Sequence, residues 1–154
     1  ETAREHDPKV LVEEGIHGRE IECGVLEGRD GARPRTTIPG QVVVTGRDFY
    51  DFDAKYLDAE AARLVIPADL PDAVSAEIRR LAAEAFEAMD CEGLARVDFY
   101  YTDDGDVLVN ELNTMPGFTP TSMFPLLWQH SGLSYPELVS ELIQLALSRR
   151  IGLR

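Results

Sequence analysis

The segment that most limits the possible folds of this chain is residues 93–113, GLARVDFYYTDDGDVLVNELN. It holds two runs rich in aromatic, aliphatic and β-branched residues, and the pair Asp104-Gly105 separates them. An Asp-Gly pair between two such runs is a strong signal for a tight two-residue turn. The segment therefore predicts an antiparallel β-hairpin, which needs further strands or a helix to cover its apolar face.

The predicted turn also determines which residues of the hairpin face each other. If the Asp-Gly pair occupies the turn, Asp98 lies opposite Glu111. In the same register Arg96 lies opposite Asn113. Because side chains alternate between the two faces of a strand, these four polar residues share one face. Residues expected on the other face, as part of a core, are Val97, Phe99, Leu108 and Leu112.

The facing carboxylates of Asp98 and Glu111 need a compensating charge, because like charges opposite each other cost about 0.2–1 kcal/mol on a solvated surface. Arg96 is one candidate for that charge. A divalent cation is the better one, because Mg²⁺ accepts oxygen ligands of Asp, Glu and Asn and shares its remaining positions with phosphates and water. This interpretation indicates a polyphosphate substrate. A solvated acidic hairpin without a ligand is the alternative.

Two further segments are candidates for phosphate contact. Lys55 lies in the aromatic run FYDFDAKYL, although a lone loop lysine is more often only solvated. In TMPGFTPTS, Gly117 lets a backbone N–H approach a ligand. Thr119, Thr121 and Ser122 precede a predicted helix, whose N-terminus favours an anion, and a turn that caps this helix is the alternative. Neither GxxxxGK[ST] nor GxGxxG occurs, so neither a P-loop nor a Rossmann site is predicted.

The region before residue 65 predicts strands and one long loop. Residues 9–14 and 19–27 alternate apolar and polar side chains, which predicts two strands of an antiparallel meander. Short strands are expected around Pro39-Gly40. Residues 46–64 are aromatic and charged without a clean period, and we expect a long functional loop there.

The rest of the chain predicts helices, which makes the fold class α+β. Residues 71–89 have the spacing of an amphipathic helix, with Asp69 or Asp72 near its N-cap. The run FPLLWQHSG predicts a short helix, and the last helix runs from a capping box at Ser134–Glu137 to about Arg149. The helical residues expected to face the core are Val74, Ile78, Leu81, Ala85, Phe86, Met89, Leu138, Leu142 and Leu145.

Composition narrows the classes of function. The 154 residues include 28 acidic and 15 basic ones, a formal net charge of −13, so we expect no binding to nucleic acid or to a membrane surface. No apolar run is long enough to span a membrane, and the first residues do not resemble a signal peptide. Cys23 and Cys91 are isolated and predict buried free thiols. We therefore expect a cytoplasmic protein, and the start at Glu1 suggests an excerpt from a longer one.

Four motifs together closely resemble the D-alanine–D-alanine ligases of the ATP-grasp superfamily. In chain order they are VLVEEGIHGRE, DFDAKYL, GLARVDF and VNELNTMPGFT. The similarity runs from about Lys9 to Arg149. It implies an ATP-grasp fold, in which helices flank a mainly antiparallel sheet. It also implies ATP-dependent, ADP-forming ligation of two D-alanines through an acyl phosphate, which yields the peptidoglycan precursor D-alanyl-D-alanine.

The resemblance implies roles for the hairpin residues. Asp98, Glu111 and Asn113 would ligate two Mg²⁺ (or Mn²⁺) ions at the phosphates of ATP, with Glu111 shared between them. Arg96 would neutralise charge on the transferring phosphoryl group, and the N–H of Gly117 would act as an oxyanion donor. No covalent nucleophile is implied, so catalysis would rest on positioning and electrostatics.

The resemblance also places the substrates. Lys55 would reach the phosphates, and Tyr56 and Ser122 would shape the subsite of the second D-alanine. The residues expected at the nucleotide are Glu13, Glu14 and Ile16 at the adenine, Glu20 at the ribose, and Phe49 and Lys55. The implied partners are D-alanine and ATP, and a homodimer is an option for the longer protein.

The family's architecture is expected to extend beyond this chain. Residues 1–67 correspond to the later part of the nucleotide-binding lobe with its substrate loop, and residues 68–154 to the C-terminal catalytic lobe. The family's N-terminal domain and glycine-rich loop are expected elsewhere, so we expect the chain to be inactive alone. The alternatives are another ATP-grasp carboxylate–amine or depsipeptide ligase, and a noncatalytic nucleotide- or metal-binding module.

Overall fold

The computed structural model describes residues 2–44 and 62–149, and its centre is an antiparallel sheet. Neighbouring strands follow the order β4-β3-β1-β5-β6, and β2 pairs with β1 off this path. The strands are β1 (Gly18–Leu26), β2 (Arg35–Thr36), β3 (Gly40–Val44), β4 (Ala62–Val65), β5 (Leu94–Thr102) and β6 (Val107–Asn113). The helices are α1 (Thr2–His6), the short 3-10 helix η1 (Arg29–Gly31), α3 (Asp72–Ala88), α4 (Met123–His130) and α5 (Tyr135–Ser148).

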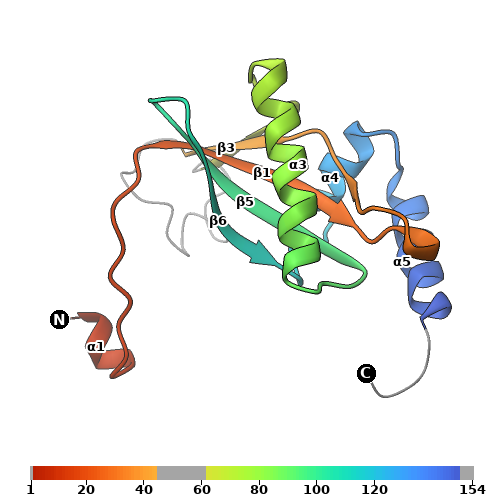
Figure 1. Ribbon diagram of the computed structural model, residues 1–154, viewed down its shortest axis with the longest axis horizontal. Coiled ribbons are helices and arrows are strands. Elements are labelled where there is room, and N and C mark those ends of the chain that lie inside the picture. The colour runs from red at the N-terminus through yellow and green to blue at the C-terminus, as the bar shows by residue number, and fades with distance from the viewer. Residues whose placement is uncertain (1, 45–61, 150–154) are drawn as a thin grey trace.

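Helices cover the two faces of the sheet unequally. Helix α3 lies across one face (Figure 1), where its Ile78 and Phe86 join Ile21, Val97 and Phe99 in the main core. Helices α4 and α5 lie at one end of the molecule (Figure 1). On the other face of the sheet, they cover β3 and the end of β1 at Leu26. The middle of that second face carries charged side chains instead. Within the described ranges, no helix is long and apolar enough to cross a membrane.

Most of the predicted elements are confirmed. Strand β1 covers residues 19–26 of the predicted strand 19–27, and β2 and β3 flank Pro39. The three predicted helices form, and α5 begins with the predicted capping box between Ser134 and Glu137. Leu138 and Leu145 are buried in the core as predicted. These leucines of α5 therefore serve packing.

The predicted strand at residues 9–14 is wrong. The segment is irregular and exposed, with Leu11 and Val12 at 80% and 87% exposure. A strand needs a neighbour for its N–H and C=O groups, and no described strand lies alongside this segment. Figure 1 shows the same segment as an extended link from α1 to the sheet.

Several smaller expectations are also corrected. Residues 62–64 belong to β4, which pairs with β3, so the predicted loop ends earlier than expected. Asp72 is the first residue of α3, directly after the N-cap residue Pro71, so the acidic residue expected near the N-cap is present. Met89 was expected to face the core but is 68% exposed. It lies just past the end of α3, where the helical spacing no longer places its side chain on the core face. Cys23 is buried as predicted, whereas Cys91 is only half-buried.

The hairpin of β5 and β6 has the predicted register at the site, but its turn is different. The N–H of Thr102 donates to the carbonyl of Asp106 at 2.9 Å, which closes a turn one residue longer than predicted. Gly105 has a φ of +91°, the left-handed conformation that glycine adopts readily. The pairs next to the turn are therefore displaced by one residue from the prediction.

A β-bulge then restores the predicted pairing. Phe99 pairs with Val109 and Asp98 pairs with Glu111, so Asn110 of β6 has no counterpart on β5. Between the turn and the bulge, the shifted register places Leu108 opposite Tyr100. Leu108 is consequently on the polar face and 39% exposed, which corrects its predicted place in the core.

Gly28, between β1 and η1, approaches the backbone closely. A Cβ at this position would lie 2.6 Å from the carbonyl oxygen of Arg33 and closer still to that of Ala32. We expect Gly28→Ala to lower the free energy of unfolding by about 1–3 kcal/mol, because the loop must shift to admit the methyl group. Gly15 is the control, since a Cβ there meets nothing within 4 Å. Urea unfolding of both variants measures the difference, and equal losses would contradict the contact argument.

Candidate functional site: a carboxylate row around a buried arginine

Three acidic residues form a row across the sheet, on the face opposite α3. Glu22 of β1 is paired with Asp98 of β5, and Asp98 is paired with Glu111 of β6. Two residues along β5, Arg96 is paired with Asn113 of β6. Paired residues of neighbouring strands point to the same face, so the five side chains emerge together. The predicted set of Arg96, Asp98, Glu111 and Asn113 is thus assembled.

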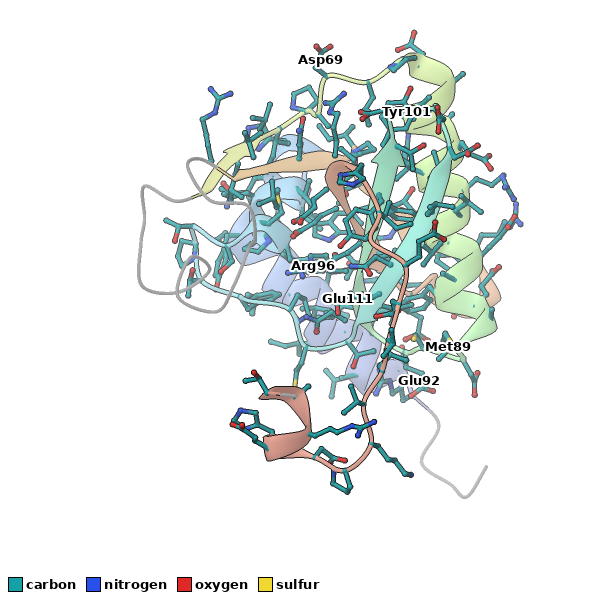
Figure 2. All side chains as sticks on the ribbon, turned by 90° about the vertical axis from the view of Figure 1, so that its left-hand side faces the viewer. Asp69, Met89, Glu92, Arg96, Tyr101 and Glu111 are labelled. Carbon is teal, nitrogen blue, oxygen red and sulfur yellow. The ribbon has the colours of Figure 1, made fainter. Side chains whose placement is uncertain are left out.

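Arg96 lies at the centre of this row, with its side chain only 6% exposed. Its Nε and Nη2 donate to the two carboxylate oxygens of Asp98 at 2.7 and 2.6 Å. Its Nε also lies 3.1 Å from Oε2 of Glu22, and its Nη2 lies 4.0 Å from Oε1 of Glu111. Figure 2 shows Arg96 and Glu111 close together near the middle of the sheet.

These contacts keep Arg96 charged. Burial by itself lowers the pKa of the guanidinium, but the hydrogen bonds to Asp98 and the charges of Glu22 and Glu111 raise the pKa above its ordinary value. The buried charge of Arg96 is tolerated because it is paired with carboxylates and hydrogen-bonded. Arg96 is therefore a fixed positive charge at the base of the site.

The three carboxylates differ in their access to a ligand. The side chains of Glu22, Asp98 and Glu111 are 10%, 15% and 55% exposed. A ligand that approaches this face therefore meets Glu111 first and Glu22 last. At the end of β6, Oδ1 of Asn113 accepts a hydrogen bond from the N–H of Met115 at 3.0 Å, which orients the amide.

The oxygen donors of this face suit a hard divalent cation. Two carboxylates and an amide oxygen are ligands that Mg²⁺ accepts. Over residues 2–44 and 62–149, no group of three or more His, Cys, Asp or Glu side chains is arranged to hold a metal ion. Asp98, Glu111 and Asn113 would therefore need phosphate or water oxygens to complete a coordination shell, as Mg²⁺ commonly has.

A second cluster follows β6, at the start of α4. Ser122 is the N-cap residue of α4, and its Oγ accepts a hydrogen bond from the N–H of Thr119 at 3.1 Å. The hydroxyl of Thr119 lies 2.8 Å from Oγ of Ser122 and 3.2 Å from that of Thr121. A Cβ on Gly117 would lie 3.1 Å from Oγ of Ser122, so the two predicted residues are neighbours. The free backbone N–H groups and the dipole at a helix N-terminus favour an anion, and these hydroxyls could add hydrogen bonds to it.

Tyr100 connects the row to two of the predicted nucleotide residues. It lies on β5 opposite Glu20 of β1. Partial burial raises the pKa of Tyr100, and nearby carboxylate charges raise it further, in the order Glu20, Glu111, Glu13 and Asp98. Glu13 and Glu20 are thus close enough to the row to act on the same phenol.

The remaining predicted residues are less well placed. Glu14 and Ile16 lie in the exposed segment before β1, and Ile16 is 38% exposed. Phe49, Lys55 and Tyr56 fall outside the described residues. The prediction missed Glu22, although it alternates with Glu20 along β1 and so must share its face. The sequence pattern did not show that β1 lies next to β5, and this pairing is what brings Glu22 to the site.

Solved ligases of D-alanine have this fold. The D-alanine–D-alanine ligase of Coxiella burnetii superposes with a TM-score of 0.74 at 40% identity, over 89% of this chain and 34% of that one. The VanG D-Ala:D-Ser ligase of Enterococcus faecalis superposes with a TM-score of 0.72 at 32% identity, over 86% and 37%. The predicted α+β ATP-grasp fold is thereby confirmed.

The sequence matches narrow the class to a family. A family model described as D-ala D-ala ligase C-terminus matches residues 1–144. A D-alanine–D-alanine ligase of Pseudarthrobacter chlorophenolicus is 59% identical over 156 residues, which is 100% of this chain and 41% of that protein. The chain belongs to the D-alanine–D-alanine ligase C-terminus family. It spans less than half the length of that relative.

Proposed function

We propose that this chain is the metal- and nucleotide-binding part of a longer D-alanine–D-alanine ligase. In this reaction the γ-phosphoryl group of ATP passes to the carboxylate of one D-alanine, which gives ADP and an acyl phosphate. The amine of a second D-alanine then attacks the acyl carbon, and inorganic phosphate leaves. The observation that carries the proposal is the buried Arg96, held beside two carboxylates that suit a metal ion.

The residues of the site would stabilise negative charge at different positions of the reacting groups. Two Mg²⁺ or Mn²⁺ ions, held by Asp98, Glu111 and Asn113, would neutralise the phosphate oxygens. Arg96 places its fixed charge next to these ligands, where negative charge develops during phosphoryl transfer. The N–H of Gly117 would donate to the oxyanion formed when the amine attacks.

The substrate contacts follow the family resemblance. Glu13, Glu14 and Ile16 would meet the adenine and Glu20 the ribose, supported by the positions of Glu13 and Glu20 around Tyr100. Nucleotide and phosphate contacts are also proposed for Phe49 and Lys55, and Tyr56 with Ser122 would form the acceptor subsite. We further propose a cytoplasmic location, where ATP is available, and a homodimer as an option that a molar-mass measurement tests.

The division at residue 67 is proposed as one of function. Residues 1–67 would bring the later nucleotide contacts and the substrate loop, and residues 68–154 the metal ligands and Arg96. Strand β1 lies between β3 and β5, so strands from both sides of residue 67 share one sheet. Glu20 of β1 and the proposed metal ligands of β5 and β6 are therefore held by one sheet.

The full-length protein that contains this chain provides the test of the ligase proposal. With ATP, Mg²⁺ and D-alanine it should release phosphate and form D-alanyl-D-alanine in equal amounts. Nucleotide binding without turnover would instead support the noncatalytic module. Phosphate release without dipeptide would contradict the ligase assignment.

The acceptor is the part of this function with a specific rival, because VanG, a D-Ala:D-Ser ligase, superposes on this chain. We expect the full-length protein at neutral pH to form D-alanyl-D-alanine in preference to D-alanyl-D-lactate or D-alanyl-D-serine. Competition among the three acceptors, followed by mass spectrometry, measures this preference. A product dominated by depsipeptide or by D-alanyl-D-serine would contradict it.

Ser122 should contribute to acceptor binding. If its hydroxyl donates to the carboxylate of the second D-alanine, Ser122→Ala should raise the KM of that substrate by about tenfold or more, because a hydrogen bond to a charged group is lost. Thr121→Val is the matched control, since it removes a neighbouring hydroxyl that contacts Thr119 and not Ser122. A similar rise in KM in both variants would point to a disturbed loop.

A further inference from the structure

We propose that Glu22 is a positioning residue of this reaction: its carboxylate anchors the guanidinium of Arg96 from the buried side of the row. This anchor keeps Arg96 in place when Asp98 and Glu111 turn their oxygens to a metal ion. The inference rests on the proposed function and adds to it a residue that the family resemblance left without a role.

Glu22 has the surroundings of an anchor. It lies on β1, which is paired with β3 on one side and with β5 on the other, so its backbone position is fixed within the sheet. The residue is 8% exposed and its partner Arg96 is 5% exposed. A carboxylate so well covered is tolerated where it is paired with a charge, and Oε2 of Glu22 lies 3.1 Å from Nε of Arg96.

The need for a second anchor follows from competition for Asp98. Arg96 forms a bidentate pair with both oxygens of Asp98. A metal ion that takes an oxygen of Asp98 weakens this pair, because the oxygen's electrons are then shared with a stronger charge. Of the two other carboxylates, Glu111 is 4.0 Å from Arg96, mostly exposed and itself a metal-ligand candidate.

Glu22 is therefore the carboxylate that can hold Arg96 while the outer part of the row binds metal and phosphate. Being farthest from solvent, it is also the least accessible of the three to an incoming ligand. Its negative charge and its buried position therefore suit Glu22 to holding Arg96 in place.

The test uses Glu22→Gln in the full-length protein, since glutamine keeps the size of the side chain and removes its charge. The matched control is Glu141→Gln. Glu141 of α5 is also well covered, at 15% side-chain exposure, and also pairs with arginines, Arg29 at 2.6 Å and Arg35 at 2.5 Å. Thermal unfolding of both variants checks that each is folded.

We expect Glu22→Gln to lower kcat by about 10- to 100-fold, as for residues that orient the groups around a metal site. The KM of D-alanine should change little, because Glu22 is not expected to touch that substrate. Binding of Mn²⁺ with a non-hydrolysable ATP analogue, followed by electron paramagnetic resonance, should weaken, because Arg96 then depends on Asp98 alone. Glu141→Gln should leave kcat and Mn²⁺ binding unchanged.

A double-mutant cycle shows whether Glu22 acts through Arg96. In an Arg96→Lys background, which loses the forked guanidinium, Glu22→Gln should cause little further loss of kcat or of Mn²⁺ binding. An undiminished loss there, a wild-type kcat in the single variant, or an equal loss in Glu141→Gln would overturn the proposal.

Failure of the ligase proposal is recognised separately. If the wild-type protein forms no dipeptide, the proposed function is wrong, and the Mn²⁺ measurement alone then decides the role of Glu22. Weaker Mn²⁺ binding in Glu22→Gln, coupled to Arg96, supports the anchor in that case, and unchanged binding overturns it.

Discussion

Replacing Glu111 by glutamine in the full-length protein is expected to abolish ligation, with a loss of about a thousandfold or more in kcat. Glu111 is the most accessible carboxylate of the row and faces Asp98. In the proposed function it is shared between two metal ions. Charge stabilisation by a bound metal is worth several kcal/mol in the transition state, and each 1.4 kcal/mol is about tenfold in rate. Kinetics of phosphate release and dipeptide formation measure the loss.

The fold should survive this substitution, because the side chain of Glu111 is 55% exposed and contributes nothing to the core. Thermal unfolding should be within a few degrees of the wild type. Asp106→Asn is the control, since Asp106 is an exposed carboxylate at the turn of the same hairpin. Near-normal ligation by Glu111→Gln would refute the metal assignment, whatever the control does.

Residues 1–154 alone are expected to form no dipeptide, although they carry Arg96 and the proposed metal ligands. Phosphoryl transfer depends on holding ATP and the acceptor in line, and a misplacement of about 1 Å can cost on the order of a hundredfold in rate. The family resemblance assigns the pocket of the first D-alanine and the glycine-rich loop to segments outside these residues. Without them, water would reach the acyl phosphate and the first substrate would have no pocket.

This second prediction is tested by assaying residues 1–154 and the full-length protein side by side with ATP, Mg²⁺ and D-alanine. Leu11 and Val12 are largely exposed, so only the monodisperse fraction should be assayed. Turnover within a factor of about ten of the full-length protein would show that the proposed division of the site is wrong. Nucleotide binding without turnover is the expected result.

Local rules in the sequence were sufficient for most of the helices and strands of this protein. Alternation predicted β1, and the two β-rich runs around Asp104-Gly105 predicted β5 and β6. The three-to-four spacing predicted α3, and the Ser134–Glu137 pair predicted the start of α5. Each of these signals acts between residues that are neighbours in the chain, which is why they can be read without the fold.

The pairing of Asp98 with Glu111 was predicted correctly, but from a turn and a strand geometry that the structure does not have. A two-residue turn with regular strands predicts it, and a longer turn followed by a bulge at Asn110 produces it. Two displacements of one residue cancel at the site but not between turn and bulge, where Leu108 changes face. The sequence carries no clear signal for the bulge, because it depends on how the hairpin packs against the rest of the sheet.

What the sequence by itself determined is the inventory of the site: an arginine and two carboxylates brought together by one hairpin. The tertiary structure decided which strand lies beside that hairpin, and so brought Glu22 from far along the chain to within 3.1 Å of Arg96. Among the strands that the structure describes, it also left residues 9–14 without a partner despite their alternation. The reason is the same in both cases, because strand neighbours are chosen by packing between distant segments, and no local pattern encodes that choice.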